Sequence, residues 1–185
     1  DGNHSLPPGD AYTRNLDLFE DFVAESGFLQ FYKDHMSFYE EKAAEFRTKA
    51  PVEEMQVWLE ENFPGIRYDA YKIFFSPLAG STPHNTFAFG AKDHDYKEAY
   101  MFVEGPDSYK KFKEGEKGQG LFNSNLFTEI DHNYVNPTTD QYLSEIAEAF
   151  RGLDKWNKQQ GYGTIPSTFN EYMTWAAFTL FAYDN

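Results

Sequence analysis

The 185-residue chain contains no cysteine. This absence excludes disulfide bonds, thiolate metal sites and a cysteine nucleophile. Long apolar runs are also missing, since no segment approaches the roughly 18 consecutive apolar residues that a membrane-spanning helix needs. The most apolar segment, WAAFTLFAYDN at residues 175–185, is too short to span a membrane and predicts a buried helix. We therefore expect no membrane insertion.

Basic residues are scarce. Lysine and arginine together number 16 against 30 acidic residues, which leaves a formal net charge of −14. Because binding to phosphates needs clustered positive charge, this balance argues against nucleic acids and against anionic membrane surfaces as partners. The lysine-rich stretch at 109–117 is diluted by Glu114 and Glu116, and it is predicted to be an exposed, mobile loop or a short helix.

Aromatic residues are abundant, with 19 Phe, 13 Tyr and 3 Trp, so a core built largely from rings is expected. The length suits one domain over residues 1–185, with 1–10 as a flexible start. The chain opens with DGNHSLPPGD and without Met. This opening favours a processed, exported protein, periplasmic or on the cell surface.

The spacing of apolar residues predicts helices at both ends of the chain and strands between them. Helices are expected over 11–25, 28–48, 51–62, 123–135, 140–152 and from Ser167 to the end, and strands within 67–78, 84–90 and 98–105. Ser167 is the expected N-cap of the last helix. Helices that flank a run of strands predict an α+β fold, mostly helical with a small antiparallel sheet.

The segment FTEIDHNYVNP at residues 127–137 carries the candidate chemistry. On a helix, Thr128, Glu129 and His132 fall on one face, and residues three apart can address one ion or one water molecule. The simpler interpretation is a helix whose histidine is hydrogen-bonded in a polar seam.

Two residues elsewhere in the chain join this segment as candidates. Glu171 lies early in the apolar last helix, where a buried carboxylate needs a partner such as a metal ion or a protonated His132. His84 follows a predicted strand, in a Ser/Gly/Pro-rich loop of the kind that often carries function. The simpler interpretations are that Glu171 is a solvated glutamate near a helix terminus and that His84 is a surface histidine. The remaining histidines, His4, His35 and His94, are expected to have no role in a site.

The segments FTEIDHNYVNP and FNEYMTWA, together with FLQFYKDHMSFYEE and WLEENFPGIRYDAYKIFFSPL, resemble bacterial metallopeptidase-like domains of the DUF4932 type. The layout is also similar to that of gluzincins, in which an H-E-x-x-H helix precedes a helix that carries a glutamate ligand. The resemblance implies a zincin-like fold, with His132 and Glu171 as metal ligands and Glu129 as general base. This chain reads T-E-x-x-H, because Thr128 stands where the first histidine is expected.

A zinc hydrolase needs three protein ligands and an open position for water. Because Thr128 cannot be a ligand of this kind, a third ligand must come from elsewhere. We favour His84, which can reach the ion from its loop. Alternatively, Glu129 can itself coordinate a harder ion. The chain is therefore predicted to be a zinc-dependent hydrolase that acts on peptides or proteins. The alternatives are an inactive pseudo-enzyme that binds a peptide or glycan, and a structural domain in which these residues form a buried hydrogen-bonded cluster.

Overall fold

The computed structural model describes residues 13–75, 84–90, 96–103, 115–150 and 163–185, and within 84–90 it describes the backbone. The predicted flexible start at 1–10 and most of the lysine-rich stretch at 109–117 lie outside this part. Packing divides the chain into two compact units, Asp1–Ala44 and Glu45–Asn185. The prediction of one domain over 1–185 stays a prediction, and each unit is described by itself.

The first unit is helical over its described residues. It contains the 3-10 helix η1 (Thr13–Asn15), α1 (Leu16–Glu25), α2 (Phe28–Asp34) and the beginning of α3 (Met36–Lys49). The helix predicted over 28–48 is instead broken at His35, whose ring Nδ1 lies 2.7 Å from the carbonyl oxygen of Phe31. Neither α1 nor α2 buries a residue.

The second unit contains a three-stranded sheet and five helices that the structure describes. These elements are α4 (Val52–Asn62), β1 (Ala70–Phe75), β2 (His84–Gly90), β3 (Lys97–Val103), α5 (Glu116–Ile130), α6 (His132–Gln141), α7 (Leu143–Ala149) and α9 (Ile165–Asp184). The chain is mostly helical with a small sheet, which confirms the α+β class. No helix in the described ranges combines the length and the apolar character needed to cross a membrane.

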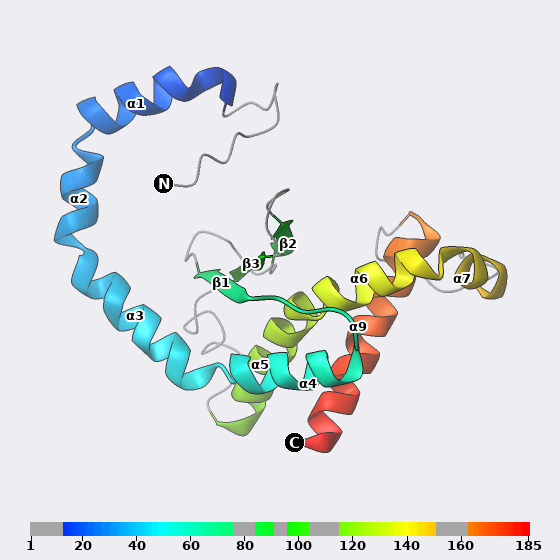
Figure 1. Ribbon diagram of the computed structural model, residues 1–185. Coiled ribbons are helices and arrows are strands. Elements are labelled where there is room, and N and C mark those ends of the chain that lie inside the picture. Colours follow the sequence, from blue (N-terminus) through cyan, green and yellow to red (C-terminus); the bar gives the residue numbers. More distant parts are fainter. Residues whose placement is uncertain (1–12, 76–83, 91–95, 104–114, 151–162) are drawn as a thin grey trace. The chain divides into compact units, whose positions relative to one another are not determined.

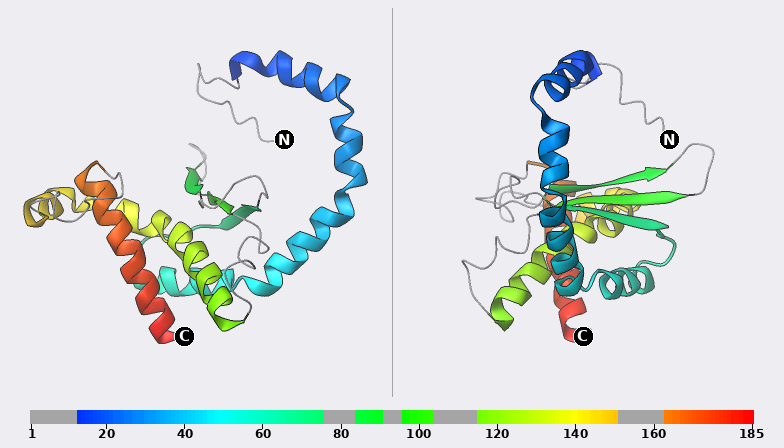
Figure 2. Two further views of the ribbon diagram at one scale, coloured as in Figure 1. Left: turned by 180° about the vertical axis from the view of Figure 1, so that it is seen from behind. Right: turned by 90° about the vertical axis from the view of Figure 1, so that its left-hand side faces the viewer.

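The sheet is mixed, so the prediction of an antiparallel sheet was wrong. The strand order is β1-β3-β2, with β3 parallel to β1 and antiparallel to β2 (Figure 2). An antiparallel meander would place β2 in the middle. Here β2 lies at the edge and β3 returns between the other two strands, in the direction of β1. Ala99, Met101 and Val103 of β3 alternate with less buried residues and turn one face of the sheet into the core.

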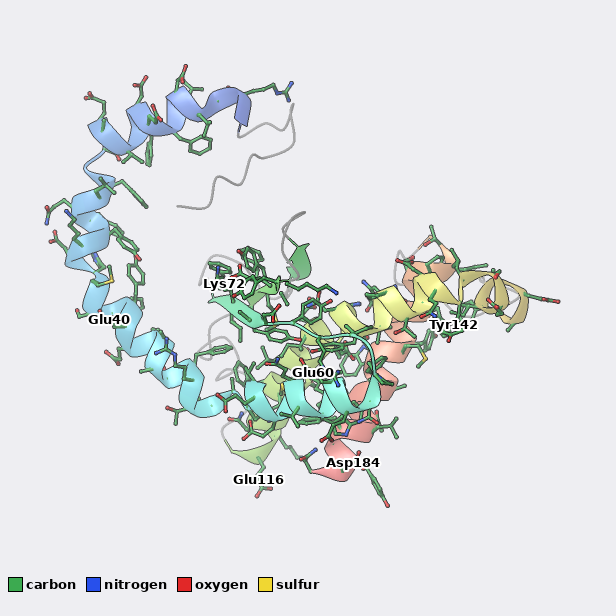
Figure 3. All side chains as sticks on the ribbon, in the orientation of Figure 1. Glu40, Glu60, Lys72, Glu116, Tyr142 and Asp184 are labelled. Atoms are coloured by element: carbon green, nitrogen blue, oxygen red, sulfur yellow. The ribbon has the colours of Figure 1, made fainter. Side chains whose placement is uncertain are left out.

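Aromatic rings form the centre of the core, as the composition predicts. Phe127 of α5 is fully buried and stacks on Phe181 of α9, with ring centroids 4.7 Å apart. Trp58 of α4 meets Phe127 edge-on at 5.8 Å. The indole nitrogen of Trp58 donates a hydrogen bond of 2.8 Å to Asp184, which Figure 3 labels at the end of α9. These contacts join α4, α5 and α9.

The last helix begins earlier than predicted. Thr164, not Ser167, is the N-cap: its hydroxyl accepts from the Ser167 amide, and the Ser167 hydroxyl accepts from the Thr164 amide. This is a capping box in which a serine takes the place of the usual Glu or Gln. The helix is only partly buried, since Ala177 and Phe181 face the core while Tyr183 is 88% exposed.

The predicted helix over 123–135 is longer and divided. It begins at Glu116, passes from α5 to α6 at Asp131, and continues beyond Pro137 to Gln141. Asp131 keeps a helical backbone, with φ of −71° and ψ of −17°. Helix α9 packs against both α5 and α6, which run through the centre of the unit in Figure 1. This packing brings two distant sequence segments to one place.

Candidate functional site

His132 and Glu171 meet where α6 packs against α9. The Nε2 atom of His132 lies 3.5 Å from Oε1 of Glu171, and their side chains are 18% and 30% exposed. His132 is the first residue of α6, and Glu171 lies in the second turn of α9. The structure therefore brings together two of the residues that the sequence singled out.

The orientation of the imidazole is determined by its other nitrogen. Nδ1 of His132 lies 3.2 Å from Oδ1 of Asn136, four residues further along α6. An amide oxygen can only accept a hydrogen bond, so the tautomer that matches this contact is the one with the proton on Nδ1. In the neutral imidazole, Nε2 is then unprotonated and presents its lone pair to Glu171.

A lone pair that faces a carboxylate oxygen is stabilised by a proton or a metal ion between the two groups. A proton shared by the two groups would draw them to about 2.7–2.9 Å, the range of charge-assisted hydrogen bonds. Two ligands of one tetrahedral ion, each about 2.0–2.1 Å from it, lie roughly 3.3 Å apart. The observed separation of 3.5 Å is closer to the second arrangement. The spacing is compatible with two ligands of one metal ion, and equally with an ion pair between Glu171 and a protonated imidazole.

Glu129 adds a second carboxyl group to this site. It lies near the end of α5 and is partly buried. Burial, with repulsion from the Glu171 carboxylate, raises the pKa of Glu129 to about 7. A carboxyl group with such a pKa can take up and release a proton near neutral pH, as a general acid or base must.

Asp131, which connects α5 to α6, is a third carboxyl group that the sequence did not identify as important. It is fully buried, and neither of its side-chain oxygens has a hydrogen-bond partner in the described part of the protein. Burial, with repulsion from Glu129 and Glu171, raises the pKa of Asp131 well above its ordinary value. Carboxyl groups are thus gathered around the His132–Glu171 pair, and burial favours the neutral forms of Glu129 and Asp131 unless a cation compensates their charge.

Thr128, at the position where the resemblance implied a histidine, offers no ligand to the site. It is buried, and its hydroxyl donates a hydrogen bond of 3.2 Å to the carbonyl oxygen of Asn125, in its own helix. Within the described residues, no three histidine or acidic side chains are grouped closely enough to hold a metal ion. His132 and Glu171 therefore fit a metal ion only as part of a ligand set.

His84 was predicted both to lie in a loop and to begin a strand over 84–90, and the structure has the strand. Its backbone forms the first residue of β2, where it pairs with Phe102 of β3. The register shifts between His84 and Phe87, so the strand starts with an irregularity that the Ser/Gly/Pro-rich sequence did not distinguish from a loop. The imidazole lies outside the described side chains, and its role as a third ligand stays a prediction.

Sequence reasoning missed Asn136 as well as Asp131. Asn136 could have been found, because residues four apart on a helix are neighbours and a metal-binding histidine usually donates its second nitrogen to an oxygen. Asp131 carried no such signal. Its burial follows from the packing of α5 and α6 against α9, which the local sequence does not specify.

The comparisons with known proteins do not show a family. No family model matches the chain, and no solved structure matches it significantly. Over 107 residues the chain is 28% identical to a threonine–tRNA ligase of Mycoplasma genitalium, and this region is 58% of the chain and 18% of the ligase. The chain thus spans less than a fifth of that ligase. The resemblance to DUF4932-type domains stays a prediction, as do the zinc ion and export from the cell.

Proposed function

We propose that the chain is a metal-dependent, peptidase-like hydrolase with a divergent zinc site, on a zincin-like variant of the α+β fold and of the DUF4932 type. The observation that carries this proposal is the separation of 3.5 Å between Nε2 of His132 and Oε1 of Glu171. The proton on Nδ1 leaves Nε2 able to bind a metal ion.

His132 and Glu171 would hold the ion, and His84 would be the third ligand. Bound zinc would act as a Lewis acid and would make water a better nucleophile. Such an ion would favour the ionised forms of Glu129 and Asp131, whose pKa values burial raises. Since metal ions bind ionised carboxylates, binding would also lower the pKa values of the carboxyl groups nearby.

Glu129 is the proposed general base. It is near enough to Glu171 for the two carboxylates to repel each other, and it lies one helical turn before His132. With a pKa of about 7, it can accept a proton from an attacking water molecule and then pass it to the leaving amine. This role needs no covalent intermediate and is consistent with the absence of cysteine.

The place of β2 favours an extended peptide as the substrate. Among the described strands, β2 pairs on one side only, with β3, and it contacts both α5 and α6. An extended peptide can add to such an edge through main-chain hydrogen bonds. It would then run beside the helices that carry Glu129 and His132.

The test is zinc binding followed by turnover. Apo protein, prepared with a chelator and then dialysed, is titrated with zinc in a calorimeter, and a mixture of unstructured peptides is then offered as substrate. We expect one zinc ion per chain, at least tenfold weaker binding in His132→Ala and Glu171→Gln, and full binding without peptide cleavage in Glu129→Gln. Glu53→Gln, an exposed change on α4, is the matched control. A wild-type protein that binds no zinc would refute the proposal.

The pseudo-enzyme is a second candidate, favoured by Thr128. Its hydroxyl is directed to its own helix, and the described residues do not complete a three-ligand group. In that case β2 would still bind an extended peptide but no bond would be cut. Retention of a peptide that remains intact for hours with zinc present, and equally so in Glu129→Gln, would favour this candidate.

A further inference from the structure

Helix α6 contains a proline in its interior, at position 137. Proline has no amide hydrogen, so it cannot make the helical hydrogen bond to the carbonyl four residues earlier, and its ring crowds that carbonyl. The carbonyl in question belongs to Asn133, which is buried and directly follows His132. A buried carbonyl without a donor costs free energy, so a replacement donor is needed here.

Tyr68 supplies that donor from outside the helix. Its hydroxyl donates a hydrogen bond of 2.8 Å to the carbonyl oxygen of Asn133. Tyr68 is itself buried, at 8% exposed, and it lies just before β1. Burial raises the pKa of the Tyr68 hydroxyl above its ordinary value, so the group remains a donor throughout the physiological pH range.

A second tyrosine contact holds the same turn of α6. The hydroxyl groups of Tyr71 in β1 and Tyr134 in α6 are hydrogen-bonded to each other. The ring of Tyr68 meets the rings of Tyr71 and Tyr134 edge-on, with centroids 5.8 Å and 5.5 Å apart. The first turn of α6 is therefore attached to β1 and to the residue just before it.

We propose that Tyr68 is a positioning residue for His132: its hydroxyl replaces the amide that Pro137 lacks and holds the first turn of α6 so that Nε2 of His132 faces Glu171. Pro137 removes one backbone hydrogen bond from α6. The hydroxyl of Tyr68 donates to the carbonyl that this bond would have used, and it links this turn to the start of β1. The consequence for metal binding rests on the function proposed above. The coupling between Tyr68 and Pro137 does not, because it follows from the hydrogen bond alone.

The test is a double-mutant cycle with Tyr68→Phe, Pro137→Ala and the double variant. Pro137 is exposed, and alanine restores an amide that can reach the Asn133 carbonyl. In the Pro137 background, Tyr68→Phe should weaken zinc binding about tenfold or more, shift the imidazole ¹⁵N resonances of His132, and lower the unfolding midpoint. In the Pro137→Ala background, the same change should have less than about a third of each effect. Tyr71→Phe is the matched control, whose effect should be the same in both backgrounds.

Each outcome decides the inference. If Tyr68→Phe alone does not fold, folding of the double variant is the expected rescue, and failure of both overturns the proposal. Equal effects of Tyr68→Phe in the two backgrounds would also overturn it, since Tyr68 would then be a packing residue only. If the wild type binds no zinc, the proposed function fails, but the His132 resonances and the unfolding midpoints still measure the coupling.

Discussion

Oδ1 of Asn136 lies 3.2 Å from Nδ1 of His132, and this contact determines which imidazole nitrogen faces Glu171. The two residues are one helical turn apart in α6. In the tautomer with the proton on Nδ1, that nitrogen donates to the oxygen of Asn136 and Nε2 is left to bind a cation. Oxygen acceptors of this kind commonly hold metal-binding histidines in place, and their loss typically costs 10- to 100-fold in metal affinity, as an order of magnitude.

Asn136→Ala should therefore lower zinc affinity by about 10- to 100-fold without unfolding the protein. Asn136→Asp, which keeps an oxygen acceptor, should retain affinity to within a few-fold. Zinc titration of both variants by calorimetry, with circular dichroism to verify folding, measures the difference. Equal affinities for the alanine and aspartate variants would show that Asn136 does not orient the ring.

The pKa of Glu129 predicts a loss of stability as the pH rises. The folded protein holds this proton more tightly than the unfolded chain, since burial raises the pKa from 4.5 to about 7. The free energy of unfolding of the metal-free protein should therefore fall between about pH 4.5 and 7, by about 3 kcal/mol at most. In Glu129→Gln the free energy of unfolding should change less with pH over this range. Urea unfolding at several pH values, with a chelator present, measures this pH dependence.

The exposed control Glu53→Gln should leave that profile unchanged. Burial also raises the pKa of Asp131, which should contribute in the same direction, so Asp131→Asn should stabilise the protein most at high pH. If the free energies of unfolding of the wild type and of Glu129→Gln changed with pH in the same way from pH 4.5 to 8, the pKa of Glu129 could not be raised.

The third ligand can be identified by substitution at His84. His84→Ala should lower zinc affinity as severely as His132→Ala, because a catalytic zinc ion is held poorly by two protein ligands. The matched control is His94→Ala, expected to have no effect on zinc binding. Equal zinc content in wild type and His84→Ala, measured by elemental analysis after dialysis, would leave Glu129 as a ligand of a harder ion, or a domain that binds no metal.

The ring cluster beneath the site should determine stability. Phe127 is fully buried and contacts Phe181 and Trp58, so Phe127→Ala should lower the free energy of unfolding by about 3–5 kcal/mol. Tyr183→Ala, which changes a residue that is 88% exposed, should alter it by less than about 0.5 kcal/mol. Urea unfolding monitored by tryptophan fluorescence compares the two variants. If Phe127→Ala lowered the free energy of unfolding as little as Tyr183→Ala, Phe127 would not be a central core residue.

Local patterns in the sequence predicted most of the elements. The helices at 11–25 and 51–62 and the three strand segments were identified because apolar periodicity and turn residues act over a few neighbours. The break at His35, the start of α9 at Thr164 and the mixed sheet were not. Each depends on a hydrogen bond or a strand partner that competes with equally acceptable local alternatives.

By itself, the sequence determined most of the helical and strand-forming segments and the aromatic core. These properties follow from residue type and short-range spacing. Only the tertiary structure decided that Glu171 reaches His132, that Asp131 is buried without a partner, and that α6 continues through Pro137. In that helix the carbonyl of Asn133 accepts a hydrogen bond from the hydroxyl of Tyr68, a residue far away in the chain. Contacts of this kind arise from how helices and strands pack, which local propensity does not encode.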